Sequence, residues 1–168
     1  LHSLPQDEFK NIGVEILKAS ELRVSMKQRM EGVKEKYHVN PNLWDRWQAW
    51  LAEDSLWPSH IGVKHGDLHP GHILIDKNNL VTGLIDWTEV GIADVSVDFM
   101  SHYLLFGKDG LKKLIDAYDN AGGKTWSRMD EHIVELLTTS GITVAEYAQV
   151  SGMKDMHDTA ANILANES

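Results

Sequence analysis

The chain has 168 residues, of which 42% are hydrophobic and 24% are charged, and this length and balance are typical of one globular domain with a buried core. Its 16 basic and 25 acidic residues give a net charge of −9, which argues against a nucleic-acid partner and is compatible with a cationic small molecule or with metal ions. Cysteine is absent, which excludes disulfides and thiolate chemistry. No run reaches the ~18 apolar residues of a membrane span, so we expect a cytoplasmic protein without a membrane partner.

The N-terminal segment predicts two helices. Pro5, which follows Ser3 by two positions, suits a first helical turn, and apolar residues at spacings of three and four extend the pattern to Leu17. Ser20 is a candidate cap for a second helix, which has its own apolar stripe and ends before Asn40-Pro41.

A third helix is expected to begin at Asn40-Pro41, and its apolar face is largely aromatic. Trp44, Trp47 and Trp50 recur along it at helical spacing. Such a face could stack on bases or sugars, but a large apolar face at this spacing usually forms core. We therefore assign the three tryptophans to packing.

The centre of the chain predicts three short strands around a polar loop. Residues 61–64 and the apolar residues 73–75 flank the loop, and turn residues then lead into a strand at residues 80–85. The last two strands suit a small hairpin. We expect Asp67 and Asp86 to be delivered from adjacent strand ends.

The C-terminal part is expected to be helical after a loop at residues 87–94. Residues 95–106 are apolar on nearly every side, which predicts a central buried helix. Further helices are expected to begin at Asp109, near Ser127 and at Asp155, with a break or kink at Gly141.

Two carboxylates and an imidazole stand out in the central stretch. Asp67, Asp86 and His72 are residue types that a site needs if it must hold a divalent cation and also accept a proton. Asp86, after an apolar strand, is the better metal ligand, and Asp67, within the loop, is the better base. The residues alone do not separate these roles.

Residues 65–76 (HGDLHPGHILID), followed by Ile85-Asp86-Trp87, resemble the catalytic loop and metal motif of the antibiotic phosphotransferase and choline-kinase group, which has a protein-kinase-like fold. That group carries H-x-D-x-x-x-x-N and then I-D-x, and the separation of the two aspartates here, 86 − 67 = 19, fits the pattern. The resemblance implies an α+β, mainly helical C-terminal lobe, with helices around a small β-hairpin. On this resemblance we expect the lobe to cover residues 1–168 as one domain, without the N-terminal nucleotide lobe.

The resemblance also implies the chemistry. Asp67 would orient and deprotonate an acceptor hydroxyl, and Asp86 would hold Mg2+ that bridges the phosphates of GTP or ATP. Where the group usually has asparagine, this chain has His72, which is similar to the macrolide phosphotransferases. Those enzymes phosphorylate the sugar 2′-hydroxyl of macrolides and favour GTP, and they confer antibiotic resistance. His72 would then be a second metal ligand or a contact to phosphate, since Mg2+ prefers oxygen ligands.

Five more residues receive expected roles from the resemblance. Leu74 and Ile85 would form the floor under the nucleotide base, although as buried strand residues they would need no function. His69 would face the same cleft and contact the acceptor. Asp94, and after it Asp98, would attract the dimethylamino sugar of a macrolide. Asp98 also resembles the group's structural aspartate, which accepts hydrogen bonds from loop amides, and this structural role is favoured.

Other functions remain open from the sequence. Aminoglycosides and choline are acceptors in related enzymes, and an acidic chain suits them equally well. A non-catalytic binding lobe is a second possibility. A third is a zinc hydrolase, which would leave Asp86 idle and would use His65, Asp67, His69 and His72. Residues 1–60 supply no glycine-rich hairpin, strand lysine or helix glutamate for the nucleotide, so we expect the isolated chain to be inactive in phosphotransfer.

Overall fold

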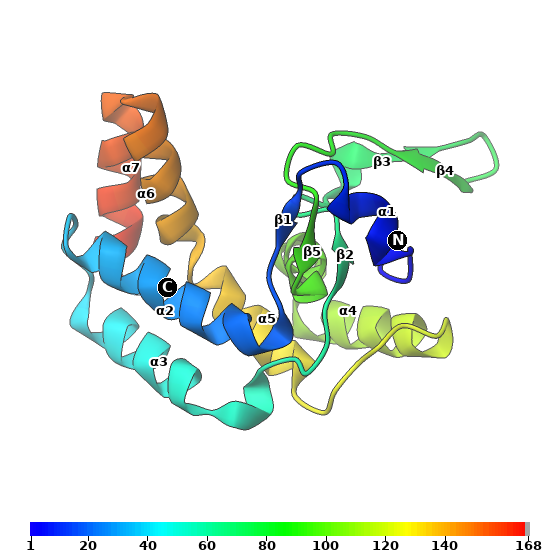
Figure 1. Cartoon of the computed structure of the whole chain (residues 1–168), viewed down its shortest axis with the longest axis horizontal. Coiled ribbons are helices and arrows are strands. Elements are labelled where there is room, and N and C mark those ends of the chain that lie inside the picture. Colours follow the sequence, from blue (N-terminus) through cyan, green and yellow to red (C-terminus); the bar gives the residue numbers. More distant parts are fainter. Residues whose placement is uncertain (167–168) are drawn as a thin grey trace.

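The computed structural model describes residues 1–166 and has two halves, with one helix between them (Figure 1). One half contains four helices: α2 (Ala19–Lys34), α3 (Pro41–Ala52), α6 (Ser140–Ser151) and α7 (Lys154–Ala165). The other half contains the strands, the short α1 (Gln6–Lys10) and the long α4 (Met100–Asn120). Helix α5 (Met129–Leu137) lies between the halves. The chain is mainly helical, as predicted. Within residues 1–166, no helix is both long and apolar enough to cross a membrane.

Two small sheets hold the central loop. The first has the order β1 (Glu15–Ile16), β5 (Gly91–Ala93), β2 (Gly62–Lys64), with β1 parallel and β2 antiparallel to β5. The second is the predicted hairpin of β3 (Ile73–Ile75) and β4 (Val81–Leu84). Asp67 follows β2 and Asp86 follows β4, so the expectation of adjacent strand ends is wrong. The two strands belong to different sheets, and the folding of the loop brings the carboxylates together.

The tryptophans of α3 pack in the core of the helical half, as predicted. Trp47 and Trp50 are 0% and 2% exposed, and Trp44 packs against the same cluster while partly buried. The buried indole of Trp47 donates its Nε1–H to Thr138 Oγ1 at 2.9 Å. With its polar group satisfied, the ring contributes its apolar area in full, and truncation of such a side chain costs about 3–5 kcal/mol.

The first helix is shorter than predicted. Helix α1 ends at Lys10, and Gly13, with a φ of +79°, turns the chain into β1. Ile16 pairs in parallel with Ile92 of β5, and the Leu17 amide donates to the Ile92 carbonyl at 2.9 Å. The predicted helical stripe to Leu17 is therefore wrong, and so is the assignment of residues 87–94 entirely to a loop. Both errors have the same cause: β1 and β5 stabilise each other, and the two strands lie far apart in the sequence.

The helix ends agree with prediction at some positions and differ at others. Asn40 caps α3 through its side chain, as expected. Helix α2 begins at Ala19, where the Glu21 carboxylate accepts a hydrogen bond from the Lys18 amide at 2.9 Å, so Ser20 is not the cap. Gly141 lies inside α6, and the expected break comes just before it, between α5 and α6.

Residues 95–106 do not form a central buried helix. A short 3-10 helix, Val95–Phe99, precedes α4, which continues past Asp109 to Asn120 with a kink at Gly107 (φ 64°). Three apolar side chains of α4 face solvent, with exposed fractions of 71%, 58% and 61% for Leu104, Leu105 and Phe106. The covered side of α4 packs against α5 and the short 3-10 helix, and the helix lies at the edge of the molecule (Figure 1).

Candidate active site

Asp98 anchors the central loop. Its carboxylate accepts hydrogen bonds from the amides of His65 and Gly66, both at 2.8 Å, and its Oδ2 lies 2.9 Å from His2 Nε2. The Asp98 side chain is 1% exposed, and a buried carboxylate requires donors of this kind. These are the hydrogen bonds that the resemblance implies, so the structure favours the structural role of Asp98 over contact with a substrate.

The start of the loop is closely packed. Gly66 has a φ of +93°, and a Cβ at this position would lie 2.2 Å from the carbonyl oxygen of Glu89, so a larger residue does not fit. His65 is fully buried, and its Nε2 donates to the Ile85 carbonyl at 2.9 Å. His65 therefore ties the loop to the segment that carries Asp86. It is not available as a zinc ligand, which removes one ligand from the zinc hydrolase hypothesis.

His72 lies between the two carboxylates. Its Nδ1 donates to the Asp67 carbonyl at 2.8 Å and lies 3.8 Å from Asp67 Oδ2, while its Nε2 lies 3.7 Å from Asp86 Oδ2. The Asp67 and Asp86 side chains are 57% and 52% exposed, whereas His72 is 14% exposed. A 3-10 turn at Pro70–His72 brings the imidazole back over the loop. The structure thus brings these three predicted site residues together.

Asp86 has an unusual backbone and an ionised side chain. Its φ of 62° is left-handed, which is uncommon outside glycine and is concentrated at functional sites. A 2.6 Å hydrogen bond from Thr88 Oγ1 is the main cause that holds the pKa of the Asp86 carboxyl below its usual range. An ionised oxygen donor suits Mg2+. Its 3.7 Å separation from His72 Nε2 is also within the about 4.2 Å that two ligands can span around one ion at about 2.1 Å.

The remaining loop and hairpin residues are accessible. Leu74 and Ile85 are 45% and 43% exposed, so the expectation that both are buried strand residues is wrong. The His69 ring packs on the His72 ring, with 3.8 Å between centroids, and its Nδ1 accepts a hydrogen bond from the Gly71 amide at 3.1 Å.

Asp94 is buried beside a cleft. Its Oδ2 accepts a hydrogen bond from His132 Nε2 at 2.7 Å, and its Oδ1 accepts one from the Ser96 amide at 2.9 Å. Burial by itself would raise the pKa of the Asp94 carboxyl, but the His132 and Ser96 hydrogen bonds outweigh it and hold the pKa below its usual range. Asp94 is thus an anion with its donors already in place.

The cleft has a volume of about 790 Å³ and extends from the start of the loop to the helical half. Gly66, Glu89 and Asp94 line it on the loop side, and α2 and α6 contribute Arg29 and Glu146. Arg29 and Glu146 form a bidentate ion pair at 2.7 and 2.8 Å. The other charged residues of the lining are three acids and one base: Glu15, Glu89, Asp94 and Lys64.

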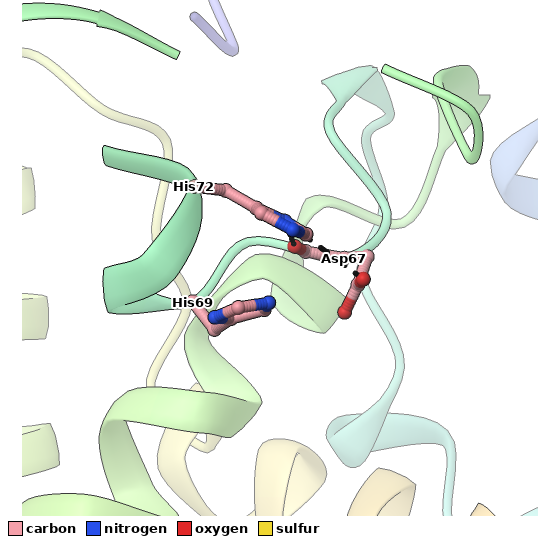
Figure 2. A group of neighbouring side chains, drawn as sticks. All are labelled: Asp67, His69 and His72. Atoms are coloured by element: carbon pink, nitrogen blue, oxygen red, sulfur yellow. Dashed lines mark hydrogen bonds and ion pairs between the residues drawn. The ribbon is translucent and has the colours of Figure 1, made fainter. Parts of the chain in front are cut away.

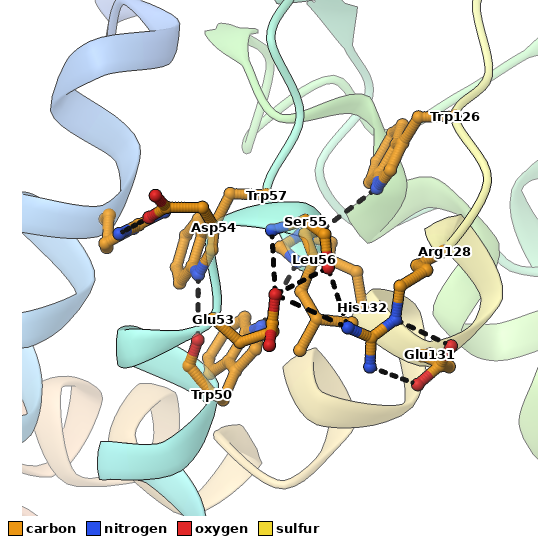
Figure 3. Close-up of polar contacts among 11 residues, drawn as sticks. Trp50, Glu53, Asp54, Ser55, Leu56, Trp57, Trp126, Arg128, Glu131 and His132 are labelled. Carbon is orange, nitrogen blue, oxygen red and sulfur yellow. Dashed lines mark hydrogen bonds and ion pairs between the residues drawn. The ribbon is translucent and has the colours of Figure 1, made fainter.

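Sequence reasoning missed His132 and His2. Figure 3 shows His132 among Trp50, Trp57 and Trp126, and Trp50 Nε1 donates to its Nδ1 at 3.3 Å. His132 is fully buried and holds Asp94, while His2 contacts Asp98. Neither histidine lies in a recognisable motif, and each is distant in sequence from its aspartate, so no local signal could have identified it.

Comparisons with known proteins identify the family of the chain. The family model of the phosphotransferase enzyme family (APH) matches residues 1–132. The chain is 40% identical over 148 residues to the uncharacterized protein YcbJ of Bacillus subtilis (strain 168), an alignment that covers 88% of this chain and 48% of YcbJ. The structure is similar to macrolide 2'-phosphotransferase type I, with a TM-score of 0.94, 36% identity, and coverage of 100% of this chain and 56% of that one.

Two other solved structures extend the comparison. The apoenzyme of macrolide 2'-phosphotransferase MphH from Brachybacterium faecium has a TM-score of 0.92 and 27% identity, covering 100% of this chain and 58% of that one. The GDP complex of aminoglycoside 2'-phosphotransferase-IIIa has a TM-score of 0.76 at 19% identity, covering 98% and 56%, which shows the fold alone. The chain spans about half the length of these relatives. The predicted fold class is confirmed, and the chain belongs to the phosphotransferase enzyme family.

Proposed function

We propose that the chain is the catalytic and acceptor-binding lobe of a nucleotide-dependent antibiotic kinase that phosphorylates a hydroxyl of a macrolide amino sugar and confers resistance. One observation carries the proposal. Asp67 and Asp86 converge on His72, at 3.8 and 3.7 Å, beside a cleft with acidic lining. The two macrolide 2'-phosphotransferase structures that cover the whole chain support this choice of acceptor.

Asp67 is the proposed base. Its carboxylate is more than half exposed, at the end of the loop that Asp98 anchors, so an acceptor hydroxyl can reach it. Hydrogen bonding to Asp67 would orient the hydroxyl and take its proton as the phosphoryl group is transferred. His72, which binds the Asp67 backbone carbonyl, keeps the loop in this shape.

Asp86, together with His72, is the proposed holder of Mg2+, which when bound supplies positive charge to the nucleotide phosphates. The ionised Asp86 oxygens fit that ion, and His72 either joins them as a ligand or contacts a phosphate oxygen. The exposed apolar surfaces of Leu74 and Ile85 suit the floor under the base of GTP, or of ATP. Such an enzyme would act in the cytoplasm, where both nucleotides are present.

The cleft is the proposed acceptor site. Its volume of about 790 Å³ is within the range of about 300–1,000 Å³ for sites of drug-sized ligands. Glu89 and Asp94 on the loop side would attract the dimethylammonium group of a macrolide, and His69 would contact the sugar from the loop. The same charges would also attract an aminoglycoside or choline, so these remain the alternative acceptors.

The test of the acceptor is calorimetry of the chain with erythromycin, kanamycin and choline in turn. We expect erythromycin to bind without nucleotide and Asp94→Asn to weaken it. If kanamycin or choline binds and erythromycin does not, the compound that binds replaces the macrolide as the proposed acceptor. The 168 residues themselves should give no phosphate transfer from GTP, since Asp67 and Asp86 do not clamp a triphosphate unaided, and turnover would contradict this proposal.

The test of the base requires an enzyme of the relatives' full length that carries this lobe. Asp67→Asn should lower kcat about 100- to 10,000-fold, since a positioned base contributes that much. Asp45→Asn, an exposed carboxylate on α3, is the matched control and should leave kcat unchanged. Binding of macrolide by a full-length protein that never phosphorylates it would favour the non-catalytic binding lobe.

A further inference from the structure

We propose that Asp67, His69 and His72 form a binding site for a transition-metal ion such as Zn2+, next to the magnesium position at Asp86 and sharing His72 with it. Each of the three residues offers one ligand atom, and these atoms lie within 4.8 Å of one another (Figure 2). The Asp67 carboxylate and both imidazoles come from a single loop of six residues, 67–72. The loop therefore presents three donors without any help from remote segments.

The hydrogen bonds around the site prepare one of its ligands. Because His72 Nδ1 donates its proton to the Asp67 carbonyl at 2.8 Å, the Nε2 atom of neutral His72 has a free lone pair. A backbone carbonyl that binds the second ring nitrogen in this way is the usual support of a metal-binding histidine.

His69 must give up one contact to bind a metal. Its Nδ1 accepts the Gly71 amide proton at 3.1 Å, and a metal on either ring nitrogen removes this acceptor, since the other nitrogen then carries the proton. The contact is a single hydrogen bond in an exposed turn, where water can replace it. Figure 2 shows the His69 ring beneath that of His72. The two rings are tilted by 43°, and their centroids are 3.8 Å apart.

The donor set selects the class of ion. Two imidazoles and one carboxylate suit Zn2+, Ni2+ or Cu2+, and a zinc site of three protein ligands keeps a fourth position open. Mg2+ prefers oxygen ligands and should remain at Asp86. The two positions therefore prefer different ions but share His72, whose Nε2 lies 3.7 Å from Asp86 Oδ2, so a Zn2+ ion that takes this nitrogen leaves Mg2+ with Asp86.

The consequence for catalysis rests on the proposed function. A Zn2+ ion at this site would occupy the Asp67 carboxylate, which the proposed reaction needs as its base. Zn2+ would then inhibit phosphotransfer while Mg2+ and nucleotide are still bound, and additional Mg2+ would not relieve the inhibition.

The binding test is calorimetric titration of the chelator-treated chain with Zn2+ at a fixed excess of Mg2+. We expect one ion per chain, and His69→Ala should weaken binding at least about tenfold, because one of three ligands is lost. His38→Ala, an exposed histidine after α2, is the matched control and should leave the affinity unchanged. Imidazole NMR signals of His69 and His72 should shift on saturation, and circular dichroism should show that His69→Ala still folds.

Two outcomes overturn the site: no saturable binding below about 1 mM Zn2+, or stoichiometric binding that His69→Ala leaves unchanged. These outcomes do not depend on catalysis. A chain that binds Zn2+ through His69 supports the site even if the proposed phosphotransfer fails. A full-length enzyme that phosphorylates macrolides but does not bind Zn2+ refutes the site and leaves the proposed function intact.

Discussion

Asp86 combines a left-handed backbone with a carboxyl whose pKa is lowered by a neighbouring hydroxyl. Thr88 Oγ1 donates to its Oδ1 at 2.6 Å and is the main cause of the shift. We therefore predict that Thr88→Val raises the pKa of Asp86 toward its ordinary value. A carboxyl carbon NMR titration measures this pKa directly. Thr82→Val, which removes a hydroxyl on β4 that donates to the Leu74 carbonyl, is the control, and an equal shift in both variants would contradict the assigned cause.

The Asp94 and His132 pair should make the stability of the chain depend on pH. The pKa of Asp94 in the folded state is below its usual value, so the stabilisation is complete above the unfolded pKa of about 3.9 and is lost as pH falls through the folded pKa. Asp94→Asn should lower the free energy of unfolding by about 1–3 kcal/mol at pH 7 and reduce its acid dependence. Urea unfolding at pH 7 and in acid measures both effects. An unchanged acid dependence, relative to Asp45→Asn, would show that another carboxyl is responsible.

At the scale of elements, α3 follows a local pattern, whereas the strands β1 and β5 depend on partners remote in sequence. The aromatic stripe of α3 and the Asn40 cap were predictable because helical neighbours lie three or four positions apart. The short strands β1 and β5 contain two and three residues, too few for a pattern of their own. They exist because Ile16 and Ile92 pair in a sheet that also includes β2.

The contact between α6 and α7 gives a test at this scale. Gly141 of α6 has no room for a side chain, since a Cβ there would lie 2.9 Å from the fully buried Leu164 of α7. Gly141→Ala should therefore lower the free energy of unfolding by about 1–3 kcal/mol.

Gly32→Ala in α2 is the matched control, because its Cβ would meet nothing within 4 Å. It should raise the free energy of unfolding by about 0.5–1 kcal/mol, since alanine favours the helix. Urea unfolding of both variants measures the two changes in the free energy of unfolding. If they shift in the same direction, the contact between α6 and α7 is looser than the structure shows.

For the whole molecule, the arrangement of the halves decides which apolar surfaces are covered. Leu105 and Leu111 both lie on α4, yet they are 58% and 0% exposed. Leu111→Ala should lower the free energy of unfolding by about 2–5 kcal/mol, because it leaves a cavity. Leu105→Ala should change it by no more than about 0.5 kcal/mol. Thermal and urea unfolding test this pair, and a large cost for Leu105→Ala would restore the predicted burial of residues 95–106.

The candidate site was predictable in part. Residues 65–76 and Asp86 stood out because their chemistry lies in two short segments, and the structure brings Asp67, Asp86 and His72 together. Their catalytic and metal-binding roles are proposals. The sequence could not separate His65, which is buried beneath the loop, from His72, since both are histidines of one polar stretch.

The sequence by itself determined the mainly helical class, the packing of the aromatic stripe, the β-hairpin and the family resemblance, because periodicity, turn residues and contiguous motifs are local. Only the tertiary structure decided the pairing of β1 with β5, the exposure of the first turns of α4, and the pairing of His132 with Asp94. Each of these depends on segments remote in sequence that meet only in the folded chain, and burial is set by what such segments cover.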